Sequence, residues 1–347
     1  MLSLIAWLYG LGVAIRNYLY DKGIFEVHDL GARAISIGNI TAGGTGKTPL
    51  VAYVARELAA KGEKVCILTR GYGREDENKR VLVSDGETVL ADASIGGDEP
   101  VELATKLLGK AIVIADADRV GAAEWAKRKF GVTAFVLDDG FQHRMVRRDV
   151  DVVCIDATDP FGRRKLLPAG RLRESAENLS RADVVVITRV EQAEDISDLI
   201  SQISEIAPDS TVIECRTRLA GARLLTAETQ RRRDKKTKLE LSGPSLPTEH
   251  LFAFCGLGNP ESFFALLRQS RMDVAESRAF RDHHQYAQRD VDDLERSARE
   301  AGTEALITTA KDAVKLADLR FSLPCYVAEI EVEMDDPAAF ALAVLPH

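Results

Sequence analysis

The sequence predicts an α/β protein with a mostly parallel sheet, helices on both faces of that sheet, and a second, smaller α/β domain. Short apolar segments recur along the 347 residues and alternate with helical stretches, which is typical of parallel strands buried on both faces. One such segment, Ile35–Ile37, runs into a glycine-rich turn and then into a helix that opens near Gly46-Lys47-Thr48. A change of composition over residues 226–250 is typical of a linker between two domains.

The first 22 residues form a separate apolar segment. Residues 1–15 carry no charged side chain, and apolar residues recur there at helical spacing. This uncharged stretch of 1–15 is shorter than the roughly 20 residues that span a bilayer, and it lacks the basic leader and cleavage site of a signal peptide. Two interpretations remain. The helix docks on the protein's own core, or it lies in a membrane interface with Arg16 and Lys22 near the head groups.

The turn after the first strand has the composition of a phosphate-binding loop (P-loop). It consists of Thr41, Ala42, Gly43, Gly44, Thr45, Gly46, Lys47 and Thr48. Backbone N–H groups of such a loop surround phosphate oxygens, the lysine neutralises them, and the hydroxyl that follows holds Mg²⁺. Thr41 stands where a glycine is usual, and Gly43 and Gly44 supply the flexibility instead. The sequence therefore predicts a nucleotide site at this turn.

The remaining elements follow the same alternation. In the larger domain, residues 23–225, a helix is expected at Pro49–Ala60, further strands at Val65–Leu68, Ala111–Ile114, Ala134–Leu137, Val150–Ile155, Val184–Ile187 and Thr211–Ile213, and helices at Val101–Leu108 and Arg119–Phe130. In the smaller domain, residues 251–347, strands are expected at Leu251–Phe254, Ala305–Thr308 and Cys325–Val332, and a helix at Glu261–Ser270. The sequence thus predicts a P-loop NTPase-like domain joined to a second α/β unit.

Carboxylates cluster at two predicted element ends. Asp98 and Glu99 open a helix, where acidic residues often act only as caps. Asp138 and Asp139 follow a strand, and ligands of open α/β sheets bind at the carboxyl ends of strands. An acid there can hold Mg²⁺ directly or through water, whereas the alternative is a simple Asp-Gly turn. With a P-loop in the same domain, we expect a metal-associated pair.

Cationic and aromatic side chains follow two other strands. Arg70, Tyr72 and Arg74 lie in the turn after one strand, and Arg171 and Arg173 lie in the loop 166–174. A guanidinium binds a phosphate group through paired hydrogen bonds. These loops are therefore candidates for contacts with a phosphorylated substrate.

Two features of the second half of the chain are notable. His283 and His284 follow Asp282, and a histidine beside a carboxylate is a candidate partner of a general base. The basic run from Arg231 to Lys238 lies in the linker. It is typical of a solvated surface, and a role against anionic lipid or phosphate is the alternative.

Composition excludes several classes of protein. A formal charge of −8 argues against a general nucleic-acid-binding protein, which needs a basic surface. The five cysteines are far apart in the sequence and odd in number, and no two of them form a Cys-x-x-Cys pair. This pattern indicates reduced cysteines in a cytosolic compartment and argues against a zinc site.

Taken together, the motifs resemble those of the tetraacyldisaccharide 4'-kinase family, which acts in the lipid A pathway of Gram-negative bacteria. The similarity runs in order through nearly the whole chain, over residues 38–49, 69–74, 97–100, 138–143, 167–170, 172–174, 256–260, 282–283 and 311–316. Two positions depart from the family pattern. Arg171 stands where the family often has a proline or another uncharged residue, and Ala310 stands where an acid often precedes Lys-Asp-Ala-Val.

The resemblance implies a reaction. ATP would donate its γ-phosphate to the 4'-hydroxyl of a tetraacyl disaccharide 1-phosphate, which forms lipid IVA. Asp98 is implied as the base and His283 as its partner, although the sequence leaves His284 open. The other implied roles are phosphate binding by Thr41–Thr48, Mg²⁺ binding by Thr48, Glu99, Asp138 and Asp139, and substrate binding by Arg70, Tyr72, Arg74 and Arg173.

The resemblance also implies a location. The family works on a lipid at the cytoplasmic face of the bacterial inner membrane, so the apolar first helix is expected to contact the membrane surface as a peripheral anchor. The acylated disaccharide 1-phosphate is then the partner molecule. We expect a monomer without a nucleic-acid partner.

Three other functions compete with this interpretation. Switch ATPases of the partition or membrane-site-selection kind have a similar glycine-rich loop, but they carry a lysine where Ala42 stands here, and that lysine reaches across a dimer. A GTPase needs an Asn-Lys-x-Asp motif to read guanine, and Ala310-Lys311-Asp312 is not one. A membrane scaffold would not need the P-loop. Consumption of ATP that depends on a lipid sugar would separate the kinase from all three.

Overall fold

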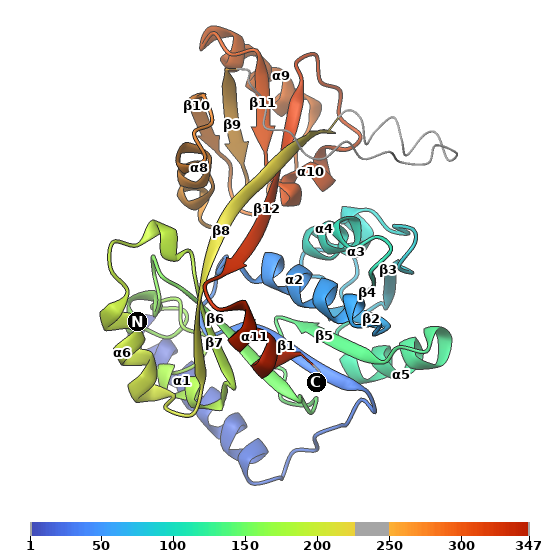
Figure 1. Cartoon of the computed structure of the whole chain (residues 1–347), viewed down its shortest axis with the longest axis vertical. Helices are drawn as coiled ribbons and strands as arrows, with labels where there is room; N and C mark the ends of the chain where they lie inside the picture. Colours follow the sequence, from blue (N-terminus) through green and yellow to red (C-terminus); the bar gives the residue numbers. More distant parts are fainter. Residues whose placement is uncertain (1, 226–249, 346–347) are drawn as a thin grey trace. The chain divides into compact units, whose positions relative to one another are not determined.

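The chain folds into two compact α/β units, described here from a computed structural model that covers residues 2–225 and 250–345 (Figure 1). Unit 1 contains the residues up to Arg216 and the segment from Val332 onward, and unit 2 contains Thr217–Glu331. The two long strands β8 (Thr211–Leu224) and β12 (Cys325–Met334) carry the chain between the units. The basic run Arg231 to Lys238 and nearly all of the predicted linker lie outside the described residues.

The sheet of unit 1 has the strand order β8-β7-β6-β1-β5-β2-β4-β3. Its remaining strands are β1 (Arg33–Asn39), β2 (Val65–Thr69), β3 (Val81–Ser84), β4 (Ala111–Ala115), β5 (Ala134–Asp138), β6 (Val150–Asp156) and β7 (Val184–Thr188). The pairs are parallel except β3 with β4. Most of these strands are buried along their whole length, which is why they read as continuous apolar runs. The predicted parallel sheet is confirmed.

Helices cover both faces of this sheet. The helices of unit 1 are α1 (Leu2–Asp21), α2 (Lys47–Ala60), α3 (Ala93–Gly96), α4 (Asp98–Lys106), α5 (Arg119–Phe130), α6 (Ser197–Ile206) and α11 (Pro337–Val344), with 3₁₀ turns at Gly162–Arg164, Ala176–Arg181 and Val190–Gln192. Alternate strand residues such as Leu68 and Leu137 pack against α5, and Ile155 and Ile187 pack near α6. On α2, Tyr53 makes an edge-to-face contact with Phe340 of α11.

Unit 2 has a smaller sheet with its own core, in which β9 to β12 pair in parallel. Its strands run in the order β10-β9-β11-β12-β8, and the elements not yet given are β9 (Leu251–Cys255), β10 (Val274–Ala279), β11 (Ala305–Thr308), α8 (Pro260–Gln269), α9 (Gln288–Glu300) and α10 (Ala310–Leu316). Phe252 and Phe254 pack against α9, and Ala253 and Cys255 pack against α8. All five cysteines of the chain are free and buried.

The boundaries of the units differ from the predicted domains. Unit 2 begins within β8 rather than after the linker, and the C-terminal segment with α11 belongs to unit 1. The burial of Phe340 explains why the C-terminal segment belongs to unit 1, because the ring of Phe340 is fully buried beside Tyr53 of that unit. The prediction assigned residues 251–347 to one domain, and it contained no element after Val332 that could have indicated the return to unit 1.

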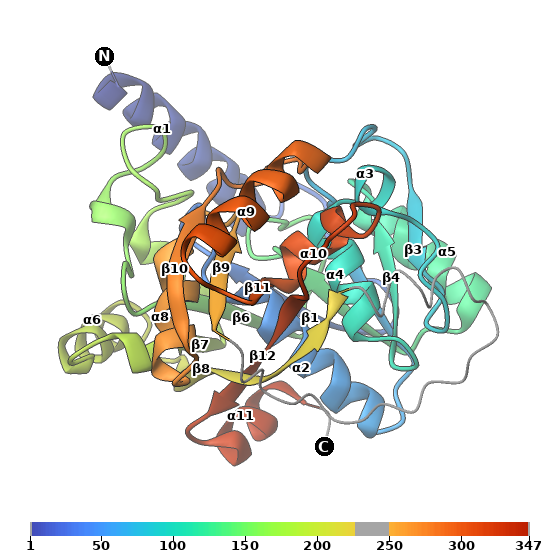
Figure 2. The ribbon, with the colours of Figure 1, turned by 90° about the horizontal axis from the view of Figure 1, so that it is seen from above.

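Helix α1 is longer than its uncharged segment and stands partly away from the rest of unit 1 (Figure 2). Among the described residues it is the helix long and apolar enough, by length and composition, to cross a membrane, and only 11% of that stretch is buried. Its polar residues make the docking contacts, since Arg144 donates to the Asn17 carbonyl and pairs with Asp21. Trp7 and Leu11 stay exposed. Thus the helix docks through these polar contacts and the buried Ala6, and it keeps an apolar face toward solvent.

Candidate active site

The P-loop connects β1 to α2, and side chains at the ends of two strands of the sheet hold it in place by hydrogen bonds. Asn39, the last residue of β1, donates to the Thr41 carbonyl at 2.7 Å and to the Thr45 hydroxyl at 3.0 Å. The Thr188 hydroxyl at the end of β7 donates to the Thr45 carbonyl at 2.9 Å. Gly46 precedes α2 in the left-handed region with φ 76°, which glycine adopts without strain. The predicted strand, turn and helix are therefore in place, and the backbone amides at the start of α2 lack intrahelical partners.

Asp138 lies at the same sheet edge as the P-loop. It ends β5, which pairs with β1 and with β2, and its Oδ2 accepts a 3.0 Å hydrogen bond from the Thr69 hydroxyl at the end of β2. Burial raises the pKa of Asp138 to about 7, and the nearby carboxylates of Glu99 and Asp139 add to that rise. Three acids therefore lie near one another where a cation would relieve their repulsion.

Asp139 joins two cations from different parts of the chain. Its Oδ1 lies 3.3 Å from Lys47 Nζ of the P-loop, and its Oδ2 lies 2.6 Å from Arg173 Nη1. Burial alone would raise the pKa of Asp139, but Lys47 and Arg173 outweigh it and lower the pKa to about 2. Asp139 has a left-handed backbone with φ 54°, the conformation in the Asp-Gly turn that directs its carboxylate toward the loop.

The predicted metal residues fit a divalent cation that also binds phosphate. Among the described residues, no three His, Cys, Asp or Glu side chains are arranged to hold an ion by themselves. A Mg²⁺ ion at a P-loop needs only one or two protein ligands, because phosphate oxygens and water supply the others. The buried Oδ1 of Asp139 faces Lys47 Nζ at 3.3 Å beside the P-loop, and Thr48 lies in the first turn of α2. Asp138 and Glu99 complete an acidic set of the kind that Mg²⁺ prefers.

Asp98 is the first residue of α4, and its carboxylate is buried. Gly97, not Asp98, occupies the N-cap position. A Cβ on Gly97 would lie 3.3 Å from the Gly71 Cα, so the start of α4 packs closely against the Arg70–Arg74 loop. Asp98 therefore lies buried in the first turn of α4, where an acid also complements the helix dipole, and beside the loop predicted to bind substrate.

The predicted substrate residues adopt different positions. Arg70 is exposed, and its guanidinium lies 5.0 Å from the centre of the Tyr72 ring. Arg74 differs from the expectation of a presented guanidinium, because it is buried and donates to the carbonyls of Ala115 and Glu77. Arg74 shapes the loop in this structure. Arg173 contacts the acidic pair through Asp139.

The sequence analysis missed Arg119. This residue begins α5, is 4% exposed, and has a lowered pKa because it is buried, although Asp138 and Asp139 act in the opposite direction. Its Nε is buried without a hydrogen-bond partner among the described residues. The available signal was its place after Asp118 at the start of a predicted helix, a position where acids are more usual than cations.

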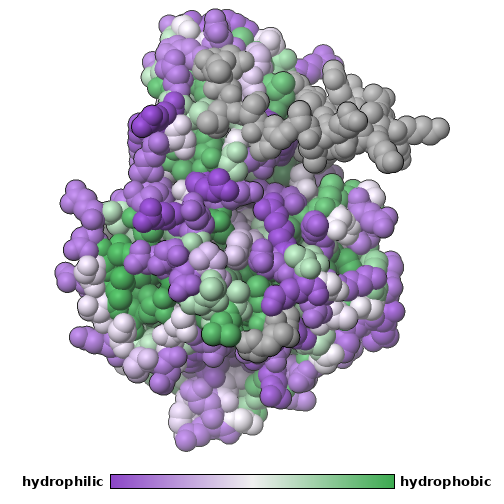
Figure 3. Space-filling view, in the orientation of Figure 1, coloured by the Kyte–Doolittle hydropathy of each residue, from purple (hydrophilic) through white to green (hydrophobic). Residues whose placement is uncertain are grey.

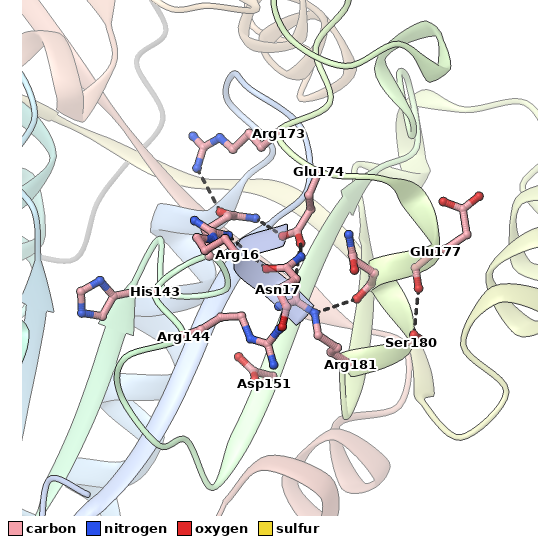
Figure 4. Close-up of polar contacts among 12 residues, drawn as sticks. Arg16, Asn17, His143, Arg144, Asp151, Arg173, Glu174, Glu177, Ser180 and Arg181 are labelled. Carbon is pink, nitrogen blue, oxygen red and sulfur yellow. Dashed lines mark hydrogen bonds and ion pairs between the residues drawn. The ribbon is translucent and has the colours of Figure 1, made fainter. Parts of the chain in front are cut away.

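The sequence analysis also missed the buried centre formed by Glu174 (Figure 4). Glu174 accepts hydrogen bonds from Gln142 at 2.7 Å, from Arg181 at 2.6 Å and from Asn17 of α1 at 3.3 Å. Gln142 also donates to the carbonyl of Asn39, just before the P-loop. A fully buried carboxylate thus ties α1 to the phosphate-binding edge of the sheet. These partners are 32, 7 and 157 residues from Glu174 in sequence, a pairing that no local pattern predicts.

In unit 2, the two candidate histidines have different surroundings. His284 Nε2 lies 3.2 Å from Asp290, and its ring stacks on Phe280 with centroids 4.7 Å apart. His283 is exposed and has φ 57°, and its backbone N–H donates to Asp282. Asp282 in turn pairs with Lys311 at 3.0 Å. His284 is therefore built into an aromatic cluster, whereas His283 is presented at the surface of unit 2.

Comparisons with known proteins agree over the full length. The family model described as LpxK, tetraacyldisaccharide-1-P 4'-kinase, matches residues 1–346. A tetraacyldisaccharide 4'-kinase of Geobacter metallireducens is 39% identical over 99% of this chain and 96% of its own length. One from Halothermothrix orenii is also 39% identical, over 96% of this chain and 88% of its own length.

A solved structure has the same fold. It is the "apo" form of LpxK from Aquifex aeolicus in complex with ATP, with a TM-score of 0.74 and 28% sequence identity. The alignment covers 98% of this chain and 96% of that one. With the P-loop, the acidic edge and the match over the whole length in place, this chain belongs to the LpxK family of tetraacyldisaccharide-1-P 4'-kinases.

Proposed function

We propose that this kinase transfers the γ-phosphate of ATP to the 4'-hydroxyl of a tetraacyl disaccharide 1-phosphate, a lipid A precursor, and so forms lipid IVA. The observation that carries the proposal is the shared contact of Asp139 with Lys47 and Arg173 beside the P-loop. It brings two cations to the place where a triphosphate would lie. The names of the relatives and the ATP complex of the Aquifex aeolicus protein support the same reaction.

At the ATP end, the chain would act by binding and charge neutralisation. The backbone amides from Thr41 to Thr48 would surround the β- and γ-phosphates, and Lys47 would exchange its contact with Asp139 for phosphate oxygens. Thr48, Glu99, Asp138 and Asp139 would hold Mg²⁺, which supplies positive charge to the phosphates when bound. Phosphoryl transfer needs such positioning more than covalent chemistry.

At the acceptor end, Asp98 would take the proton from the sugar hydroxyl. Its burial beside the Arg70–Arg74 loop supports this role, because that loop is the proposed substrate site. We propose His283 as the partner of Asp98, since His284 is engaged by Asp290 and Phe280. Arg70 and Tyr72 would contact the substrate directly, Arg74 would hold their loop, and Arg173 would approach the transferred phosphate.

The lipid substrate requires access from a membrane. The apolar face of α1 supports a peripheral position at the cytoplasmic face of the inner membrane, since several large apolar side chains there are exposed. A helix with such a face lies in the interface of the bilayer and buries that face among the acyl chains. The polar contacts of Tyr9 and Asn17 with the loop at 173–174 would then hold the catalytic edge near the lipid surface. We propose a monomer.

Phosphate transfer from γ-labelled ATP to a purified acylated glucosamine disaccharide 1-phosphate tests the proposal. Asp98→Ala is expected to lower kcat by about 10² to 10⁴ with ATP binding retained, because general-base catalysis contributes that much. The matched control is Asp92→Ala. Asp92 is an exposed carboxylate that caps α3 six residues earlier, so its loss should cost about 1 kcal/mol of stability and no turnover. Hydrolysis of ATP by the wild type without labelled lipid would contradict the kinase.

A further inference from the structure

The loop at 171–173 pairs with the entrance of the P-loop. The Ala42 N–H donates to the Arg171 carbonyl at 2.6 Å, and the Arg173 N–H donates to the Ile40 carbonyl at 2.8 Å. Leu172 between them is buried. Because side chains alternate along an extended segment, Arg171 and Arg173 extend to the same side, opposite Leu172. Adjacent cations of one short segment therefore flank the phosphate-binding turn.

The guanidinium of Arg171 lies directly on the P-loop. Its Nε donates to the Ala42 carbonyl at 2.9 Å, and its Nη1 pairs with Asp159 at 2.7 Å. A Cβ placed on Gly43 would overlap Nη2 of Arg171, and Gly43 has φ 115°. Two physical reasons therefore favour glycine at position 43: its left-handed backbone and the space that the guanidinium occupies.

The third donor group of this guanidinium, Nη2, differs from the other two. Nη2 makes no hydrogen bond to any residue that the structure describes, although Nε and Nη1 are both engaged. The side chain is 42% exposed. Two of its three nitrogens fix the plane of the group, so the remaining N–H groups are held at Gly43, at the first turns of a loop that surrounds phosphates.

This position matters for phosphoryl transfer. Negative charge is spread over the oxygens of the transferred group in the transition state, and an arginine supplied by the same chain can stabilise it. Switch ATPases place a lysine at the position of Ala42 and bring it across a dimer. Here the loop has an alanine, and the cation comes instead from Arg171, 129 residues away in the same chain.

We propose that Arg171 is an arginine finger in cis: when ATP is bound, its Nη2 donates to the γ-phosphate during transfer to the lipid hydroxyl. The inference rests on the proposed kinase function and adds a residue that the family pattern often lacks. Asp159 and the Ala42 carbonyl orient the guanidinium before ATP binds, so little reorganisation is needed at the moment of reaction. Arg171 would then make its contact chiefly in the transition state.

The test compares Arg171→Ala with Arg164→Ala, which removes an exposed arginine of the preceding 3₁₀ turn that contacts Phe161 and Gln202 rather than the P-loop. Arg171→Ala is expected to lower kcat of lipid phosphorylation by about 10² to 10³, as for loss of one preorganised donor, with the dissociation constant of ATP changed less than about threefold. Arg164→Ala is expected to match the wild type. The kcat of Arg171→Lys should lie between those of the wild type and Arg171→Ala, because an ammonium group cannot keep both orienting bonds and still reach the phosphate.

A binding measurement separates a catalytic contact from a purely structural one. Arg171→Ala should lose affinity for ADP with aluminium fluoride by a factor similar to the loss in kcat, while its affinity for ADP alone stays at the wild-type level. Equal losses for both ligands, or a kcat within about threefold of the wild type, would overturn the inference. If the wild type labels no lipid, the proposed function fails. The ADP and aluminium fluoride affinities then still decide whether Arg171 contacts the transferred phosphate.

Discussion

The hydroxyl of Tyr9, on the exposed helix α1, donates a 2.7 Å hydrogen bond to the backbone carbonyl of Arg173, the residue whose guanidinium binds Asp139. One hydrogen bond therefore joins the apolar helix to the segment that lies against the P-loop. Asn17 makes a second connection through Glu174 on the next residue. The helix that we propose to meet the membrane is thus attached to the site that we propose to bind ATP.

Tyr9→Phe should loosen this attachment without changing the apolar surface of α1. A lost hydrogen bond of this kind costs about 1 kcal/mol. That energy corresponds to roughly a fivefold loss of protection against amide hydrogen exchange. Amide hydrogen exchange of the segment Leu2–Asp21 measures it. Tyr18→Phe is the matched control, because Tyr18 lies on the same helix and is 57% exposed. Equal exchange in the two variants would contradict the role of Tyr9.

Glu174→Ala is expected to destabilise unit 1 by about 3–5 kcal/mol. The reason is that Arg181, largely buried and stacked over Phe141, would keep its charge without a partner. Urea unfolding measures the change. Glu177→Ala removes an exposed carboxylate from the same segment and should stay within about 0.5 kcal/mol of the wild type. A small effect of both substitutions would show that the cluster adds little to stability.

The sequence predicted the parts of this molecule that depend on local order. The P-loop is such a part, because the strand, the glycines and Lys47 are adjacent in the chain and each has its own requirement. The parallel strands β1, β2, β4 to β7 were found for the same reason, since each is a continuous apolar run. Strand β3 was missed because it is a short, half-buried antiparallel edge strand.

Contacts between distant segments were the part that could not be predicted. Nothing in the letters around Arg171 indicates that its guanidinium lies on Gly43, and the burial of Arg74 depends on a carbonyl of β4. Helix α1 is the clearest example. Its apolar spacing predicted either docking or exposure, and the structure combines both, because polar residues such as Asn17 make the docking contacts. Local patterns assign an element but do not assign the partner of each side chain.

The stability of the metal-free protein should depend on pH through two buried groups. The pKa of Asp138 is raised from 3.8 to about 7, chiefly by burial. Its contribution to the free energy of unfolding is therefore full below pH 3.8 and is lost as the pH rises through 7. The pKa of His143 is lowered from 6.5 to about 4, again chiefly by burial. Its contribution is therefore full above pH 6.5 and is lost as the pH falls through 4.

Asp138→Asn removes one of these two dependences. Relative to the wild type, the variant should gain stability steadily from pH 4 to pH 7, by at most about 1.4 kcal/mol per pH unit. His143→Gln should show the opposite trend, because its stability relative to the wild type should fall as the pH rises. Urea unfolding in the presence of EDTA, at intervals over that range, measures both. A difference between Asp138→Asn and the wild type that does not change with pH would contradict the raised pKa.

Membrane binding should depend on the apolar face of α1 and not on exposed apolar residues in general. Trp7 and Leu11 lie four residues apart on this helix, and both are exposed. Trp7→Asp with Leu11→Asp should lower binding to anionic lipid vesicles at least tenfold, because burial of each side chain contributes about 1.5–3 kcal/mol. Vesicle flotation at constant ionic strength measures the effect.

The control for this measurement is Leu342→Asp. Leu342 is 68% exposed on α11, over which Figure 3 shows hydrophobic surface. If exposed apolar area alone drove binding, this substitution would also weaken it. We expect it to leave binding unchanged, because α11 is a short helix of unit 1 whose other side packs on Tyr53. Equal losses for the α1 and α11 variants would mean that α1 is not the membrane contact, and its attachment to Arg173 and Glu174 would then serve only the fold.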